Sequence, residues 1–105
     1  MFLVLYSLGA GKALQKMPKG IAKRVVDSIE DLSRVDDPKR YIKKLKGSFG
    51  VPIYSYRFGD YRIILSVNDE ALVIYVIDVG DRSIIYQILT APASFWPVEH
   101  PEANI

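Results

Sequence analysis

Arg-Phe-Gly-Asp-Tyr-Arg, at residues 57–62, separates two runs in which apolar and polar residues alternate. Alternation of this kind is typical of β-strands with one buried face. A glycine-led pair readily supplies the positive φ that a two-residue hairpin turn requires. We therefore predict a tight antiparallel hairpin that turns at Gly59-Asp60 and joins strands at residues 53–58 and 61–67.

This turn fixes the pairing of the two strands, because it places Phe58 opposite Tyr61 and Arg57 opposite Arg62. A three-residue loop would shift the pairing by one residue and separate these partners. One face then carries aromatic and aliphatic side chains that must be buried, namely Tyr54, Tyr56, Phe58, Tyr61, Ile63, Leu65 and Val67. The opposite face carries Ser55, Arg57, Arg62, Ile64 and Ser66.

Arg57 and Arg62 are thus expected to oppose each other directly. Like charges in such positions destabilise a sheet, whereas a phosphate between them would bind both guanidinium groups. Two other arrangements fit the sequence. Both arginines can extend into water, or an acid such as Asp60 or Asp78 can neutralise them.

Length and composition narrow the class of protein. The chain has 105 residues, half of them hydrophobic, which suits one domain with a single core. It contains no cysteine, which excludes disulfides and thiolate sites and favours a reducing cytoplasm. The apolar stretches at residues 2–6 and 71–77 are too short for a signal peptide or a membrane span. We expect a cytoplasmic protein.

Positive charge is concentrated in one part of the chain. Residues 12–62 hold thirteen of the 14 Lys and Arg and six acids, a segmental charge of +7, whereas the remainder carries −5. Such a concentration favours a polyanionic partner, here nucleic acid rather than a membrane. Two amphipathic helices with lysine-rich solvent faces would explain the charge from Lys12 to Arg34 equally simply.

Two helices are predicted before the hairpin. Ser7 is a candidate cap for the first, whose apolar stripe is Ala10, Leu14 and Met17. Pro18 is suited to open the second, and its apolar residues recur at helical spacing as Ile21, Ala22, Val25, Val26, Ile29 and Leu32. We expect the two helices to form a hairpin laid across the aromatic face of the sheet.

Three further strands are predicted from apolar runs. Residues 2–6 are expected to lie inside the sheet, and residues 71–79 to form a central strand. Residues 83–88 are interpreted as a final strand. The basic connector at residues 39–47 directly precedes the arginine hairpin and includes Lys43, Lys44 and Lys46, which favours a shared anion site.

The chain is expected to divide into a domain at residues 1–89 and a proline-containing tail at residues 90–105. Phe95 and Trp96 in the tail are candidates to dock on an apolar groove of the domain or to become ordered with a partner. His100, the only histidine, is expected to be solvated rather than catalytic or metal-binding.

Three short motifs follow one another along the chain. They are Lys-Leu-Lys-Gly at residues 44–47, the stretch at residues 56–64, and Val-Gly-Asp-Arg at residues 79–82 with Tyr86 four residues on. Together they resemble the RelE/ParE superfamily of toxins from type II toxin–antitoxin systems. Their order and spacing cover residues 3–88. The resemblance implies an α+β fold in which an antiparallel sheet of four to five strands packs on an N-terminal helical hairpin, in the order β-α-α-β-β-β-β.

The RelE branch implies a ribosome-dependent endonuclease that cleaves messenger RNA in the ribosomal A site without a metal or other cofactor. The ribose 2′-hydroxyl attacks the adjacent phosphate and leaves a cyclic phosphate and a free 5′-hydroxyl. By this resemblance Arg62 and Arg82 stabilise the phosphate, and Tyr86 stacks on a base or transfers a proton. The RNA-binding residues implied are Lys43, Lys44, Lys46 and Arg57.

The sequence departs from that branch at the general base. RelE-type members carry lysines in the first hairpin strand, where this chain has Ile53, Tyr54, Ser55 and Tyr56. A connector lysine is one substitute, and a weak or inactive nuclease is the other outcome. A ParE-like DNA gyrase inhibitor and a non-toxic protein that acts with its antitoxin are the alternative functions.

The resemblance also implies the partners. They are a RelB-like antitoxin that wraps the apolar grooves and covers the basic site, the ribosome, and messenger RNA. DNA is expected only through the antitoxin complex, and no membrane contact is expected.

Overall fold

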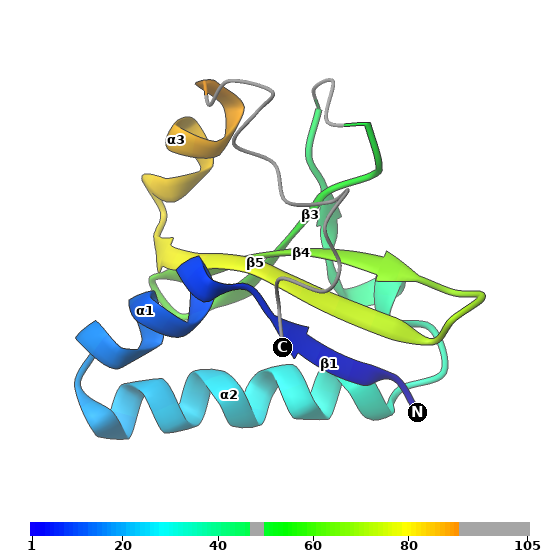
Figure 1. Cartoon of the computed structure of the whole chain (residues 1–105), viewed down its shortest axis with the longest axis horizontal. Coiled ribbons are helices and arrows are strands. Elements are labelled where there is room, and N and C mark those ends of the chain that lie inside the picture. The colour runs from blue at the N-terminus through cyan, green and yellow to red at the C-terminus, as the bar shows by residue number, and fades with distance from the viewer. Residues whose placement is uncertain (47–49, 91–105) are drawn as a thin grey trace.

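The computed structural model describes residues 1–46 and 50–90. It is an α+β fold in which one five-stranded sheet has α1 and α2 on one side and α3 on the other (Figure 1). The elements in chain order are β1 (Leu3–Tyr6), α1 (Leu8–Lys16), α2 (Lys19–Arg34), the 3-10 helix η1 (Pro38–Tyr41), β2 (Lys43–Lys44), β3 (Tyr54–Phe58), β4 (Tyr61–Asn68), β5 (Val73–Asp81) and α3 (Ile84–Thr90).

The predicted fold class is confirmed, with one difference in the sheet. The strand order is β1-β5-β4-β3-β2. β1 runs parallel to β5, and the other neighbouring pairs are antiparallel, so the sheet is mixed. A strand that is followed by a helical hairpin leaves the sheet through a long crossover, and such a connection allows a later strand to lie parallel to it.

Residues 2–6 form the predicted strand, but the expected internal position is wrong because β1 lies at the edge of the sheet. Phe2 is buried beside the end of α2, where its N–H donates to the Ser33 carbonyl at 2.8 Å. Leu3, on the opposite face, is 60% exposed. An apolar run therefore indicated burial on one face here, and it did not reveal how many strands flank it.

The hairpin forms with the predicted register. Phe58 pairs with Tyr61 and Arg57 pairs with Arg62. Gly59 has φ +58°, and among the described non-glycine residues only Leu72 has a positive φ. Positive φ at the first central position alone is the pattern of a type II′ turn, which is why glycine leads the pair. The two-residue turn excludes the one-residue slip in pairing.

The two long helices pack on the aromatic side of the hairpin, as predicted. We call this side the helix face. Ser7 caps α1, because its hydroxyl accepts a hydrogen bond from the Ala10 N–H at 3.0 Å, and Pro18 occupies the N-cap of α2. The buried core on this face includes Ala10, Val25, Ile29, Leu32, Tyr54, Ile63, Leu65, Ile74, Val76 and Val79.

The opposite side of the sheet, which carries Ser55, Arg57, Arg62 and Ile64, is called the arginine face. It is partly apolar, because a second buried cluster forms between the sheet, α3 and the segment before β3. Its members are Leu45, Ile53, Ile64, Tyr75, Ile77, Ile84 and Ile88. Leu45, which belongs to the basic connector at residues 39–47, is buried in this cluster.

Residues 83–88 do not form the predicted strand, because α3 begins at Ile84. The Asp81 carboxylate accepts a hydrogen bond from the Ser83 N–H and so turns the chain out of β5. Ile84 and Ile88 then lie on one helical face and are buried. An apolar run as short as this one fits either a strand or a helix by periodicity.

The predicted division into a domain at residues 1–89 and a tail at residues 90–105 stays a prediction. α3 extends to Thr90, and the expectations for Phe95, Trp96 and His100 fall outside the described residues. Across residues 1–46 and 50–90, no helix has both the length and the apolar character needed to cross a membrane.

Candidate functional site

Arg57 and Arg62 converge on one backbone oxygen at the end of the hairpin. Nε of Arg57 donates to the Gly59 carbonyl at 3.3 Å, and Nη1 of Arg62 donates to the same carbonyl at 3.5 Å. Nη1 of Arg62 also donates to the carbonyl of Tyr61 at 3.1 Å. The tight turn thus gathers both guanidinium groups beside each other, and each keeps several N–H donors for a ligand.

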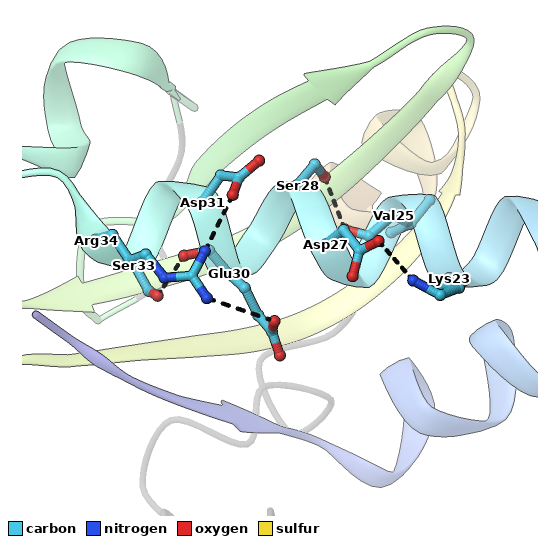
Figure 2. A network of polar contacts seen from close by, with 8 residues as sticks. All are labelled: Lys23, Val25, Asp27, Ser28, Glu30, Asp31, Ser33 and Arg34. Carbon is cyan, nitrogen blue, oxygen red and sulfur yellow. Dashed lines mark hydrogen bonds and ion pairs between the residues drawn. The ribbon is translucent and has the colours of Figure 1, made fainter.

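No acid neutralises this pair within the described chain. The ion pairs found there use Lys23, Arg34 and Lys39 as their cations, and none includes Arg57 or Arg62. Lys23 and Arg34 belong to α2 and pair with acids of the same helix (Figure 2). The alternative in which Asp60 or Asp78 neutralises the hairpin arginines is therefore not what the structure contains.

Arg82 lies close in the chain to the same end of the sheet. Arg62 pairs with Gly80 in β5, and Arg82 follows in the turn that leads to α3. A Cβ at Gly80 would lie 2.8 Å from Cδ1 of Ile84, so glycine is what allows α3 to pack against the strand here. Tyr86 is on α3 and is 74% exposed. A row of paired residues therefore crosses β3, β4 and β5 and ends beside the turn that carries Arg82. Its members are Arg57, Arg62 and Gly80.

The three connector lysines do not share one side of the sheet. Lys43 pairs with Ser55 and so belongs to the arginine face. Lys44 pairs with Tyr54, whose side chain is part of the helix-face core, so alternation directs Lys44 to the helix face. Lys46 is exposed and follows the buried Leu45. The structure groups Lys43 with Arg57 and Arg62 and separates Lys44 from them.

Asp78 is an acid on the arginine face that the sequence suggested only as a neutralising partner. It pairs with Ile64 in β4, and its Oδ1 accepts a hydrogen bond from the Val79 N–H at 2.8 Å. Burial raises the pKa of Asp78 above its usual value, and the hydrogen bond from Val79 offsets part of that rise. The signal in the sequence was a single acid inside an otherwise apolar strand.

A hollow of about 540 Å³ lies on the same side of the sheet but at its other end. Leu5, Ser66 and Tyr75 form part of its lining, and Lys39 and Asp69, which form an ion pair at 2.6 Å, also line it. Ser66 is four residues from Arg62 along β4, roughly 13 Å at the rise of a strand. The hollow and the arginine pair are therefore separate features. Residues 1–46 and 50–90 contain no group of three or more acidic, His or Cys side chains arranged to hold a metal ion.

Comparisons with known proteins identify relatives of this fold. Residues 4–86 match the family described as the ParE toxin of type II toxin–antitoxin systems, parDE. A crystal structure of the toxin–antitoxin complex RelBE2 from Mycobacterium tuberculosis contains a chain with 29% identity and a TM-score of 0.66; the match covers 78% of this chain and 92% of that one.

Two further structures are similar. The archaeal RelE–RelB complex from Pyrococcus horikoshii matches with 31% identity and a TM-score of 0.63, over 77% of this chain and 94% of that chain. The intact E. coli RelBE complex matches with 20% identity and a TM-score of 0.62, over 77% and 96%, and supports the fold alone. No curated protein matches the chain.

Proposed function

Since the chain belongs to the ParE family within the RelE/ParE superfamily and is the toxin of a toxin–antitoxin module, we propose that it inhibits translation by cutting messenger RNA at the ribosome. The cut is a ribosome-dependent endonucleolytic transphosphorylation that requires no metal. The observation that carries the proposal is the pair Arg57 and Arg62, which oppose each other across the hairpin and have no acidic partner within the described chain.

The reaction needs the groups that this end of the sheet provides. The 2′ oxygen of a ribose forms a bond to the adjacent phosphorus while the bond from phosphorus to the 5′ oxygen breaks. Negative charge grows on the phosphate oxygens in the transition state, and Arg62 and Arg82 stabilise it with directed N–H donors. Tyr86, exposed on α3, stacks on a base or transfers a proton. The products are a cyclic phosphate and a free 5′-hydroxyl.

The remaining cations hold the message. Arg57 binds backbone phosphate next to Arg62, and Lys43 extends the same surface across β2. Lys44 and Lys46 are exposed and contact RNA or ribosome outside the arginine face. Phosphate contacts of this type position the strand without reading its sequence. Binding is therefore expected to weaken steeply as salt rises.

The proposed partner is an antitoxin of the RelB type, as found in the related complexes from M. tuberculosis and P. horikoshii. Its acidic side chains would compete for the arginines that hold RNA phosphate. Association with DNA occurs only through the toxin–antitoxin complex, and the site of action is the cytoplasm.

Cell-free translation of a defined message tests the proposal, with cleavage mapped by primer extension. The purified chain should cut the message only when ribosomes are present. The double variant Arg62→Ala, Arg82→Ala should lose cutting by a factor of at least about 100, in line with removal of transition-state donors. Arg34→Ala is the matched control, because it removes a guanidinium that is paired within α2.

An intact message with normal protein synthesis would overturn the nuclease proposal. DNA supercoiling by gyrase should then be measured with the same preparation. Inhibition would support the alternative, gyrase-directed function. No effect in either assay, with antitoxin binding retained, would identify a non-toxic interaction protein.

A further inference from the structure

The proposed reaction lacks an assigned general base, and the arginine face offers an acid for that role. Asp78 lies on this face only because β5 is irregular there. Val76 and Val79 both belong to the helix-face core, although strict alternation would place residues three apart on opposite faces. The register shifts between Ile64 and Leu65, whose partners in β5 are Asp78 and Val76, so Ile77 is an extra residue.

This β-bulge redirects one side chain. Without the extra residue, the alternation that buries Ile74 and Val76 would carry Asp78 into the helix-face core. With it, Asp78 lies opposite Ile64 on the arginine face. Bulges are common next to active sites, where they re-aim a side chain. The bulge thus keeps Val79 in the helix-face core and places a carboxylate on the arginine face.

Ser7 holds the bulge in place. Its hydroxyl donates to the carbonyl of Ile77 at 2.6 Å, and its N–H donates to the carbonyl of Val76 at 2.9 Å. The same hydroxyl caps α1. A buried residue therefore satisfies the backbone oxygen that the bulge removes from the ladder, and it links the bulge to the helical layer.

The surroundings of Asp78 suit a base. Ile64 and Ile77 beside it are almost fully buried, which removes water from the carboxylate and strengthens its attraction for a proton. It forms no ion pair within the described chain, although cations share its face. The reason is geometric, because Arg57 and Arg62 direct their guanidinium groups to the Gly59 carbonyl.

The position of Asp78 relative to the phosphate clamp is also suitable. Arg62 pairs with Gly80, two residues beyond Asp78, so Asp78 and Arg62 are diagonal neighbours. Diagonal neighbours on one sheet face are about 7–8 Å apart, with the Cβ atoms slightly closer. That spacing leaves room for a ribose between a carboxylate and a guanidinium that holds the next phosphate. Lys44, by contrast, is directed to the other side of the sheet.

We propose that Asp78 is the catalytic general base that accepts the proton of the ribose 2′-hydroxyl. This inference rests on the proposed nuclease function. As the proton moves to the Asp78 carboxylate, the 2′ oxygen bonds to phosphorus and the bond to the 5′ oxygen breaks. The departing 5′ oxygen takes up one proton from water or from Tyr86, which then regains a proton from solvent, and Asp78 later releases its proton to solvent. Atoms and charge therefore balance without a co-reactant.

Cleavage at ribosomes tests this role when it is measured as a function of pH under single-turnover conditions. Charged side chains at this end of the sheet are Lys43, Arg57, Arg62 and Arg82, and the other carboxyl groups there are Asp60 in the hairpin turn and Asp81 at the end of β5. We expect Asp78 to cause a fall in the cleavage rate at low pH, which we call the acid limb. The wild-type rate should fall as pH is lowered through the ionisation of this carboxyl group. The Asp78→Asn variant distinguishes an acid limb that arises from Asp78 from one that arises from either of the other two carboxyl groups.

Asp78→Asn should lower the neutral-pH rate by about 100- to 10,000-fold and remove the acid limb. Sedimentation of the variant with programmed ribosomes should be retained, since no phosphate-binding cation has changed. Asp78→Glu should restore the acid limb with an intermediate rate, because it returns a carboxylate at a slightly altered position. Asp36→Asn is the control, as it removes an exposed acid of the same type elsewhere.

The outcomes separate the two proposals. If the wild type cuts and Asp78→Asn cuts within about threefold of it with the same acid limb, the role of Asp78 is overturned while the nuclease function stands. If the wild type does not cut at all, the nuclease function fails and this inference fails with it. Circular dichroism melts of each variant confirm that a lost rate reflects chemistry and not unfolding.

Discussion

The outer surface of α2 and the arginine face of the sheet both carry basic side chains, but the groups that these side chains contact are different. On α2, Nζ of Lys23 is 3.0 Å from Asp27 and Nη1 of Arg34 is 3.2 Å from Asp31 (Figure 2). On the arginine face, the hydrogen bonds of Arg57 and Arg62 within the described chain go to backbone carbonyls.

The difference shows that charge arrangement, more than charge density, distinguishes a solvated surface from a binding site. Acids three or four residues from a cation satisfy it within one helix and leave little reason to recruit an anion. Two guanidinium groups held opposite each other have an electrostatic cost that a phosphate removes. The same basic composition therefore gives one surface that is internally balanced and one that is open to a ligand.

Charge reversal should separate the two surfaces most strongly. Arg57→Glu should reduce message cleavage by at least about 100-fold, because it places a negative charge beside the bound phosphate. It should also stabilise the hairpin by about 0.2–1 kcal/mol, since the introduced carboxylate would then oppose Arg62. Arg34→Glu should leave cleavage unchanged and lower stability by about 0.3–0.5 kcal/mol. Cell-free cleavage and urea unfolding midpoints provide the two measurements.

The proposed difference between the two surfaces would be contradicted if both charge reversals changed stability in the same direction. It would also be contradicted if Arg34→Glu abolished cleavage. Measuring antitoxin binding by the same variants provides a further test. Arg57→Glu should weaken an antitoxin that works through the arginine face, and it should spare one that grips only the helices.

Ser7→Ala should cost about 1–3 kcal/mol of unfolding free energy, because it removes a helix cap and leaves the Ile77 carbonyl without its buried donor. Ser28→Ala is the matched control on α2, where the hydroxyl donates back to the Val25 carbonyl at 2.7 Å (Figure 2). That change should stay within about 0.5 kcal/mol. Equal losses in the two variants would show that the serine at the bulge has no special structural role.

The sequence predicted the hairpin, its register and the helical layer because each rests on local chemistry. Glycine at the turn sets the pairing, and pairing sets which residues share a face. The apolar stripe of α2 and the cap at Ser7 are likewise visible within a few residues. The opposition of Arg57 and Arg62 could be derived from the same information.

What the sequence did not reveal depends on contacts between distant segments. The edge position of β1 follows from its pairing with β5, seventy residues later. The helical state of residues 84–90 could not be separated from a strand by so short an apolar run. At the bulge, the carbonyl of Ile77 accepts a hydrogen bond from the distant Ser7 hydroxyl, and no pattern within the sequence of β5 predicts this bulge. Of these features, the bulge is the one that brings Asp78 to the arginine face.

Asp78→Asn should stabilise the protein at neutral pH by less than Ser7→Ala destabilises it. Burial raises the pKa of Asp78 in the folded state, so folding at a pH above that pKa must keep a dehydrated carboxylate charged. The cost disappears as pH falls below the ordinary pKa of an aspartate, where both states are protonated. Thermal melts across pH should show the gain at pH 7 shrinking towards pH 3. A variant less stable than wild type at pH 7 would contradict this account.

The smallest expected effect is the salt-dependent change in folding stability when one cation is removed. This change should have opposite signs on the two surfaces. Lys23→Ala removes an exposed i,i+4 pair and should cost about 0.3–0.5 kcal/mol at low ionic strength. Arg57→Ala relieves repulsion from Arg62 and should instead gain a few tenths of a kcal/mol, roughly the lower end of a cross-strand pair. Both effects should fade in 1 M salt, where the screening length is about 3 Å. If Arg57→Ala were destabilising at low salt and unaffected by added salt, the two arginines would not repel each other, and the phosphate would lose the electrostatic reason for binding between them.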